Sequence, residues 1–304
     1  MNDEIMVSVW CLTYNHEKYI RDCLEGFVNQ KTNFRFEVIV HDDASTDRTA
    51  DIIKEYADKY PDIIKPILQK ENQYSKGVNI IKEYIKPNLR GKYVAVCEGD
   101  DFWSNNTKLQ IQVDILERHQ EYVACVHQTQ VINCLNKKET LLSKYNDDVV
   151  ISERDILSNN NPVYHTSSLC YRKVLMDSEP EFVYFLNPVW DYPFGIYLSL
   201  KGNVYFLNKI MSTYRLFTEE SWSLKSKGKD MEFEFVNNKI DLLSAADQYS
   251  NYKYHKVIDA KILDFEYTLW KMAPSFSILK KDRFKRLKIS QKIKLCLKAL
   301  KSIV

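Results

Sequence analysis

The sequence contains few glycines, and none of them forms a phosphate-binding motif. Only seven of the 304 residues are glycine. Neither the Gly-x-Gly-x-x-Gly turn of dinucleotide-binding folds nor the loop that ends in Gly-Lys-Ser/Thr occurs. The common dinucleotide-dependent dehydrogenases and the P-loop enzymes are therefore disfavoured.

The sequence also lacks long apolar runs, and its first residues do not resemble a leader. No stretch of 18 consecutive apolar residues occurs, so the sequence predicts no transmembrane helix. Met1 to Glu4 lead directly into a predicted strand without a basic and apolar segment, so we expect no signal peptide. The seven cysteines show no Cys-x-x-Cys spacing and lie mostly in apolar runs. We therefore expect reduced core thiols in a reducing compartment, and neither zinc ligands nor a disulfide framework.

Strands and helices alternate through the first part of the chain. Hydrophobic patterns predict strands at 6–13, 36–40, 63–69, 92–97 and 122–127, and helices at 17–30, 48–60, 75–85 and 108–119. Short links between them favour an α/β fold with a Rossmann-like, mostly parallel sheet and helices on both faces. Beyond residue 129 the alternation weakens, with strands predicted at 165–171, 203–207 and 210–215 and helices at 191–200 and 231–272.

Polar clusters follow three of the predicted strands. Thr13-Tyr14-Asn15, Asp42-Asp43 and the run from Glu98 to Asp101 each stand at a carboxyl end. In open parallel sheets ligands bind beyond these ends, where the strand order reverses. The sequence therefore predicts one acidic, partly aromatic cleft.

The run from Glu98 to Asp101 places three carboxylates within four positions. Their mutual repulsion is unfavourable unless a cation or solvent screens it. Oxygen ligands of this kind suit Mg²⁺ or Mn²⁺. An acidic surface turn is the alternative that the residue types alone leave open.

Four segments in order carry a family resemblance. VSVWCLTYNHEKYIRDCLEGFVNQ, HDDASTDRTADII, EGDDFWSNNTKLQIQ and WDYPFGIYLSLKGNVYFLNKIMSTYR together resemble the family 2 glycosyltransferases of the GT-A fold, over roughly residues 5–223. The resemblance implies an inverting transferase that moves a sugar from a nucleotide-diphosphate sugar, with a UDP-sugar favoured, to a saccharide or lipid-linked acceptor in bacterial surface polysaccharide synthesis. It also implies a domain at 1–223, with a nucleotide-binding half at 1–128 and an acceptor half at 129–223, before a helical extension at 224–304.

The resemblance assigns roles around the donor. Asp43 would accept a hydrogen bond from the ring N–H of the base, and Asp42 would either join this pocket or serve as a capping, core-facing carboxylate. The other donor-pocket residues that it implies are Thr13, Tyr14, Asn72 and Lys76. Asp100 and Asp101 match the Asp-x-Asp-like pair that binds ribose and metal, with Asp101 as the direct ligand of Mn²⁺ or Mg²⁺.

The second half of the resemblance supplies the catalytic base. Asp191 matches the carboxylate that takes the proton of the acceptor hydroxyl as its oxygen attacks the anomeric carbon. Without the resemblance, Asp191 would be interpreted as the cap of a helix that begins at Tyr192. Arg215 would reach the diphosphate, although Phe217 replaces the histidine of the family's Tyr-Arg-x-His element. Trp190 and Trp222 could stack on the acceptor, with core packing as the alternative.

Three histidines, His41, His127 and His165, lie on or beside predicted apolar strands. A buried imidazole is normally hydrogen-bonded within the core. We therefore expect structural roles for all three.

The last 25 residues form a basic tail. Residues 280–304 carry ten Lys or Arg and one acid, a net of +9, whereas the other 279 residues have a net of −7. Apolar residues at 289, 293, 296, 297, 300 and 303 follow helical spacing. We expect this helix to bind an anionic membrane surface, which would place a cytoplasmic protein at the inner face of the cell membrane. The alternative is packing on the body or on another subunit of an oligomer.

Other functions stay open at this point. No basic and aromatic recognition motif accompanies the tail, so we expect no nucleic-acid partner. A sugar-phosphate nucleotidyltransferase shares the nucleotide and metal requirements but would need a Gly-rich loop after the first strand. A catalytically silent sugar-nucleotide-binding or scaffold protein is the alternative from a different class.

Overall fold

A computed structural model describes residues 4–159, 162–186, 189–218, 229–274, 277, 279 and 281–301. The chain forms two compact units. The first comprises residues 1–179 and 198–225, and the second comprises 180–197 and 226–304. Residues 180–197, which include Asp191, group with the C-terminal helices in this division, whereas the family resemblance implies a glycosyltransferase domain that extends to residue 223.

The first unit is built on a ten-stranded sheet with the order β3-β2-β1-β4-β9-β6-β10-β5, in which β7 pairs with β6 and β8 with β10. The strands are β1 (Ile5–Thr13), β2 (Arg35–Asp42), β3 (Ile64–Leu68), β4 (Tyr93–Val96), β5 (Phe102–Trp103), β6 (Tyr122–Asn133), β7 (Glu139–Leu141), β8 (Val149–Ile151), β9 (Cys170–Arg172) and β10 (Asn203–Leu216). Because β1 pairs in parallel with both β2 and β4, the strand order reverses beside β1.

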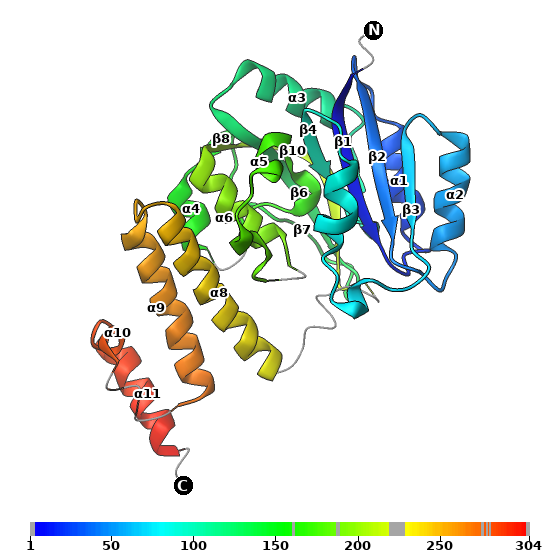
Figure 1. The fold of residues 1–304 in the computed structure, drawn as a ribbon. Helices are drawn as coiled ribbons and strands as arrows, with labels where there is room; N and C mark the ends of the chain where they lie inside the picture. The colour runs from blue at the N-terminus through cyan, green and yellow to red at the C-terminus, as the bar shows by residue number, and fades with distance from the viewer. Residues whose placement is uncertain are drawn as a thin grey trace. The chain divides into compact units, whose positions relative to one another are not determined.

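The helices of this unit are α1 (Ile20–Val28), α2 (Thr49–Lys59), α3 (Lys108–Arg118), α4 (Glu153–Ser158) and α5 (Lys173–Asp177). Figure 1 shows α1 and α2 in blue beside β1 to β3. In α1 the buried residues Ile20, Cys23, Leu24 and Phe27 follow the spacing of one helix face. They join a core with Val7, Val9 and Tyr93 of the sheet, among others. The predicted α/β architecture with a mostly parallel sheet is confirmed.

Some predicted elements take another form. The helix expected at 75–85 is instead a series of short turns, η1 (Tyr74–Lys76), η2 (Ile81–Ile85) and η3 (Lys86–Asn88). Gly77 interrupts it, because its φ of +73° is left-handed and ends the first turn. The strand expected at 165–171 begins only at Cys170, after the 3-10 turn η4 (Thr166–Ser168). The two strands expected at 203–207 and 210–215 form the single strand β10, whose register shifts between Leu207 and Ile210.

The second unit is helical. Its elements are η5 (Glu181–Tyr184), the first part of α6 (Asp191–Lys201), α8 (Lys229–Tyr249), α9 (His255–Met272), α10 (Asp282–Lys285) and α11 (Ile289–Lys301). α10 and α11 pack on α9 through a small apolar cluster that includes Phe284, Leu287, Leu295 and Trp270 (Figure 1). Among the described residues, no helix is both long enough and apolar enough to cross a bilayer. All seven cysteines are free thiols, and five of them are buried.

Candidate functional site

The three polar clusters that follow β1, β2 and β4 lie together. The backbone N–H of Asp43 donates to the carbonyl of Thr13 at 3.0 Å. The backbone N–H of Gly99 donates to the carbonyl of Leu12, also at 3.0 Å. The ends of the three strands are thus joined by backbone hydrogen bonds at the point where the strand order reverses, which is where open α/β sheets bind ligands.

Gly99 allows this close approach. A Cβ atom at this position would lie 2.5 Å from Cγ2 of Thr13 and 2.9 Å from Nδ1 of His16. Both distances are shorter than van der Waals contact, so a side chain would push the acidic loop away from β1. Glycine is therefore required here by lack of space and not by its backbone conformation.

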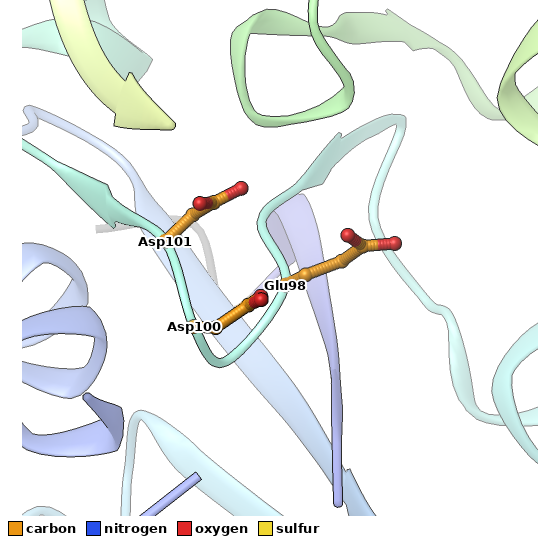
Figure 2. A group of neighbouring side chains, drawn as sticks. All are labelled: Glu98, Asp100 and Asp101. Atoms are coloured by element: carbon orange, nitrogen blue, oxygen red, sulfur yellow. The ribbon is translucent and has the colours of Figure 1, made fainter. Parts of the chain in front are cut away.

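The acidic loop between β4 and β5 carries Glu98, Asp100 and Asp101 (Figure 2). One carboxylate oxygen from each lies within 4.8 Å of the others. Asp101 is 0% exposed. Its Oδ1 accepts a 2.8 Å hydrogen bond from the backbone N–H of Arg215, whereas its buried Oδ2 has no hydrogen-bond partner among the described residues. Burial, reinforced by the charge of Asp100, raises the pKa of Asp101 well above its usual value.

These residues fit a divalent cation. A buried carboxylate oxygen without a partner is unfavourable, and a bound cation would compensate it. The donors are all hard oxygens, as Mg²⁺ and Mn²⁺ prefer. Asp100 is nearly buried, and its Oδ2 accepts a 2.9 Å hydrogen bond from Oγ1 of Thr218, which fixes the second carboxylate of the pair. The acidic surface turn, the alternative from residue types, does not describe a fully buried Asp101.

Arg215 is bound to the acidic loop by its side chain as well as by its backbone. Nη1 donates to the carbonyl of Asp100 at 2.9 Å, and Nη2 forms an ion pair with Asp22. The guanidinium lies 4.5 Å from the ring centroid of Phe102 and 5.3 Å from that of Tyr19. The structure thus places Arg215 next to Asp100 and Asp101, the predicted metal ligands. Its expected contact with a diphosphate stays a prediction.

Asp42 supports the backbone of the turn that follows β2. Its Oδ1 accepts a 3.1 Å hydrogen bond from Oγ1 of Thr13, and its Oδ2 accepts a 3.0 Å bond from the backbone N–H of Ser45. Both oxygens of this buried carboxylate are therefore engaged. This is the capping arrangement that the sequence left open for Asp42.

Asp43 organises the loop that carries Asn72. Its two carboxylate oxygens accept hydrogen bonds from the backbone N–H groups of Gln73, at 2.8 Å, and Tyr74, at 3.0 Å. Nδ2 of Asn72 donates to the carbonyl of Asp43 at 3.1 Å. Each carboxylate oxygen has a second lone pair, so Asp43 can still accept from a ligand.

The remaining donor-pocket candidates differ in their surroundings. Thr13 is buried and Tyr14 is half-buried at the end of β1. Lys76, by contrast, is exposed and forms an ion pair with Glu71. The structure therefore places Asn72 against Asp43 but engages Lys76 in a surface pair.

The three histidines also differ. His41 contacts Nε2 of Gln69 at 3.1 Å, and His127 contacts the carbonyl of Gln128 at 2.9 Å. Each ring thus has one core partner, while its other buried nitrogen has no hydrogen-bond partner among the described residues. His165 lies instead at the acidic loop, with its Nε2 3.7 Å from Oδ2 of Asp101. Burial lowers the pKa of His165 to about 4, so the ring is neutral near pH 7.

Sequence reasoning missed three residues of this site. Asp22, His165 and Thr218 all contact Arg215, Asp100 or Asp101, but none belongs to a polar cluster at a strand end. The only available signal was indirect. Asp22 and Thr218 lie within, or beside, segments that resemble the family.

Asp191, the predicted base, begins α6 in the second unit. Its Oδ1 accepts a 2.8 Å hydrogen bond from the backbone N–H of the next residue, Tyr192, in the first turn of the helix. Burial raises the pKa of Asp191, and the positive charge of Lys239 acts in the opposite direction. Lys239 is itself 7% exposed, with Nζ 4.8 Å from the ring centroids of both Tyr192 and Phe235.

The structure describes only one of the two tryptophans that were expected to bind the acceptor. Trp190 is buried and stacks on Phe194 with a centroid distance of 4.0 Å, which agrees with the core-packing alternative. Its acceptor role stays a prediction. Trp222 lies outside the described residues.

A family model described as Glycosyl transferase family 2 matches residues 8–181, more than half of the chain. The chain belongs to this glycosyltransferase family. The matched segment contains Asp43 and the acidic loop, whereas Asp191 and Arg215 lie beyond its end. The family membership predicted from the sequence is therefore confirmed.

Individual relatives support the same family. An uncharacterized protein of Mycobacterium tuberculosis is 35% identical over 216 residues, which cover 71% of this chain and 60% of that protein. The chain thus corresponds to somewhat less than two thirds of the length of this relative. A Bacillus subtilis protein described as a putative teichuronic acid biosynthesis glycosyltransferase, TuaG, is 25% identical over 78% of this chain and 89% of its own length.

A solved structure supports the fold of this family 2 chain. The crystal structure of S. aureus TarS in complex with UDP-GlcNAc superposes with a TM-score of 0.66 and 20% identity, over 96% of this chain and 79% of that chain. At this level of identity the likeness establishes the fold alone. The predicted GT-A fold with a helical C-terminal region is confirmed.

Proposed function

We propose that this chain is a metal-assisted, inverting glycosyltransferase that moves a sugar from a nucleotide-diphosphate sugar to an acceptor hydroxyl during bacterial surface polysaccharide synthesis. One observation carries the proposal. The buried, unpartnered Oδ2 of Asp101 lies in a cluster of three carboxylates, at the strand ends where α/β sheets bind ligands. TuaG is described as a putative teichuronic acid biosynthesis glycosyltransferase, and the TarS structure is a complex with UDP-GlcNAc. Both support polysaccharide synthesis and a UDP-sugar in this proposal.

The nucleotide would bind at the ends of β1 and β2. Asp43 is held by the N–H groups of Gln73 and Tyr74 and keeps lone pairs with which it can accept the ring N–H of a base. Because Asn72 donates a hydrogen bond to the carbonyl of Asp43, a ligand that binds Asp43 would also contact the loop that carries Asn72. Thr13 and Tyr14 complete the pocket in this proposal, whereas Asp42 supports it from behind.

Asp101 and Asp100 would hold Mn²⁺ or Mg²⁺. When bound, the cation supplies positive charge that offsets the negative charge building on the leaving diphosphate. Arg215 would act beside it. A guanidinium has five N–H donors, and the contacts with Asp100 and Asp22 use two of them, so others can bind an oxygen of the diphosphate.

Asp191 would be the general base. A carboxylate whose pKa is raised by burial takes up a proton more readily than an ordinary one, which suits removal of the acceptor's hydroxyl proton. Attack by that oxygen on the anomeric carbon, from the face opposite the diphosphate, inverts the configuration. The acceptor would be a saccharide or a lipid-linked saccharide.

The basic tail would dock the enzyme on an anionic membrane. In α11, Leu295 and Ala299 are buried, whereas Ile289, Ile293, Leu297 and Leu300 are exposed. Some of the apolar residues that the sequence placed on one face of this helix are therefore exposed and could insert between the lipid headgroups and acyl chains. Lys288, next to the helix, and Lys294 and Lys298, on it, are also exposed. An amphipathic helix with this composition binds anionic interfaces. In this proposal the enzyme would be cytoplasmic and would act at the inner face of the membrane.

Hydrolysis of the donor tests the central proposal. We expect UDP-GlcNAc to be hydrolysed slowly in the presence of Mn²⁺, and Asp101→Asn to reduce the rate at least about 100-fold, because the variant loses a charged metal ligand. Equal rates in the two proteins would refute the metal assignment. Binding without turnover in the wild type would favour the catalytically silent sugar-nucleotide-binding protein.

The donor is identified by a thermal-shift screen. UDP-, GDP-, dTDP- and CMP-sugars are compared in the presence of Mn²⁺, because a ligand that binds only the native state raises the unfolding midpoint. The shift is expected to be largest for UDP-sugars. A larger shift with another nucleotide would change the donor and leave the reaction class in place.

A further inference from the structure

His165 lies next to Oδ2 of Asp101, the carboxylate oxygen that has no hydrogen-bond partner in the part of the chain that the structure describes. Its Nε2 lies 3.7 Å from Oδ2 of Asp101, while Oδ1 is occupied by the backbone N–H of Arg215. The distance is too long for a hydrogen bond but would become one after a shift of less than about 1 Å. The imidazole and the carboxylate are both buried or nearly so, and water cannot readily substitute for either.

The contacts of the other ring nitrogen bear on the tautomer of His165. The backbone N–H of Ser167 donates to Nδ1 at 3.2 Å, which favours the tautomer in which Nδ1 is an acceptor. Oγ of Ser167 lies 2.8 Å from the same nitrogen, and the direction of that bond depends on the tautomer. In the favoured tautomer the single N–H of the neutral imidazole is on Nε2. The hydrogen of His165 then points toward the side on which Asp101 lies.

The orientation of the His165 ring is fixed from two sides. The ring stacks on Tyr214 with a centroid distance of 4.1 Å. Nδ1 lies 2.8 Å from Oγ of Ser167, which continues through Ser212 to Thr129 in a buried chain of hydroxyl groups. Such contacts restrict both the rotation and the flipping of the imidazole.

The turn that carries His165 is itself held in place. The indole N–H of Trp103 donates to the carbonyl of Ser167 at 2.9 Å, and Nε2 of Gln112 donates to the carbonyl of Ser168 at 2.8 Å. Because Trp103 follows the acidic loop directly, the loop and the His165 turn are connected through β5. A structural histidine would need only the Ser167 contact, whereas this ring also has its Nε2 3.7 Å from Oδ2 of Asp101.

We infer that His165 is a positioning residue that holds Oδ2 of Asp101 in the orientation in which the carboxylate meets a divalent cation. The inference rests on the proposed function, because it presumes a cation at Asp101. His165 then acts through Asp101 and does not itself touch the cation. Neighbours that orient a metal ligand in this way typically change metal affinity about 10- to 100-fold.

Two substitutions test the contribution of the N–H donor of His165 separately from that of its aromatic ring. His165→Phe keeps an aromatic ring against Tyr214 and removes the donor, whereas His165→Gln supplies an amide N–H from a side chain of similar reach. We expect Mn²⁺ in the presence of UDP, measured by electron paramagnetic resonance of the free ion, to bind about 10-fold or more weakly to His165→Phe. His165→Gln should recover most of the affinity. His127→Phe is the matched control at another buried histidine and should leave the affinity unchanged.

A second measurement does not depend on the metal. Nitrogen-15 spectra of histidine-labelled full-length protein report which ring nitrogen carries the proton. We expect the Nε2–H tautomer for His165 and a change of its Nε2 signal in Asp101→Asn. The opposite tautomer, or an Nε2 signal that ignores Asp101→Asn, would overturn the inference.

The outcomes distinguish this inference from the proposed function. If the wild type binds Mn²⁺ and His165→Phe binds it equally well, or if the Gln variant is as weak as the Phe variant, the positioning role is wrong and the proposed function stands. If the wild type binds no Mn²⁺ with or without UDP, the metal-assisted function fails, and the spectra alone decide whether His165 orients Asp101.

Discussion

The backbone N–H of Arg215 donates a 2.8 Å hydrogen bond to Oδ1 of Asp101, although the two residues are 114 positions apart. This bond orients a carboxylate that the rest of the site depends on. Because the donor belongs to the backbone, the contact does not require arginine at this position. The side chain of Arg215 can therefore be examined separately from the support that its backbone gives to Asp101.

Arg215→Ala should leave the Asp101 contact intact and remove the guanidinium. We expect donor turnover to fall by roughly 10- to 100-fold, because a charged hydrogen bond to the diphosphate contributes about 1.5–3 kcal/mol. Mn²⁺ should bind no more weakly, since a positive charge beside the carboxylates has been removed. Asp22→Asn is the control, because it breaks the Asp22–Arg215 ion pair and keeps the guanidinium. A loss of Mn²⁺ affinity in Arg215→Ala would show that the side chain supports the acidic loop instead.

Gly99→Ala should separate the acidic loop from β1. Its Cβ would lie 2.5 Å from Cγ2 of Thr13, so we expect about 1–3 kcal/mol of destabilisation in denaturant unfolding, together with weaker Mn²⁺ and UDP binding. Gly77→Ala is the contrasting variant, since its Cβ meets nothing within 4 Å and is disfavoured only by the left-handed φ of +73°. Gly77→Ala should destabilise the protein by about 1 kcal/mol and leave Mn²⁺ binding unaffected. Wild-type stability and metal affinity in Gly99→Ala would contradict the packing argument.

Asp43→Asn should loosen the loop at residues 72–75. An amide has one acceptor oxygen in place of two, so either Gln73 or Tyr74 loses its partner. We expect faster hydrogen exchange at these two amides and a loss of about 1–3 kcal/mol in UDP binding. The control is Asp42→Asn, which should weaken the turn at Ser45 and leave exchange at Gln73 and Tyr74 nearly unchanged. The reverse pattern would mean that Asp42 carries the role assigned to Asp43.

Lys239→Met should shift the acidic limb of the rate profile to higher pH. The positive charge of Lys239 lowers the pKa of Asp191 against the effect of burial, so its removal raises that pKa and a higher pH is needed to ionise the base. The measurement is the pH dependence of kcat/KM. Lys261→Met is the matched control, because Lys261 influences Lys239 but is not among the groups that shift Asp191. If the acidic limb of kcat/KM lies at the same pH in Lys239→Met, or if Asp191→Asn is fully active, Asp191 is not the general base.

The same lysine should make stability depend on pH. Burial lowers the pKa of Lys239 from 10.5 to about 8, so between these values the unfolded chain binds more protons than the folded protein. The contribution of Lys239 to the free energy of unfolding should therefore rise with pH across that window. Unfolding in denaturant at pH 7.5 and pH 10 checks the slope, which should be smaller in Lys239→Met. An identical slope in the two proteins would show that the lysine is not desolvated.

Leu297→Glu should weaken binding to membranes. Leu297 is 54% exposed on α11, so the change adds a negative charge to the proposed docking face without opening the core. We expect less co-sedimentation with vesicles that contain phosphatidylserine, and a further decrease in high salt. Leu141→Glu is the matched control, because Leu141 is 53% exposed on β7 of the other unit. Equal sedimentation of both variants, and of a chain that ends at residue 279, would reject the membrane role of the tail.

The sequence by itself determined the strands β1, β2 and β4 and the polar residues at their ends. Those strands are short, buried apolar runs, and a run of this kind is a local property of the chain. The acidic triplet and the order of the family segments are local as well. The parallel sheet then places successive strand ends at one edge, so the predicted convergence of Thr13, Asp43 and Asp101 needed no knowledge of side-chain packing.

Only the tertiary structure decided which groups complete the site. Asp22, His165 and Thr218 reach Arg215, Asp101 and Asp100 because antiparallel β9 lies between β4 and β6 and because β10 pairs with β5. Contacts of this kind join residues up to 193 positions apart and depend on strand order and register, which leave no periodic signal in the chain. The helix expected at 75–85 was wrong for a related reason: the left-handed turn at Gly77 outweighs the apolar spacing around it.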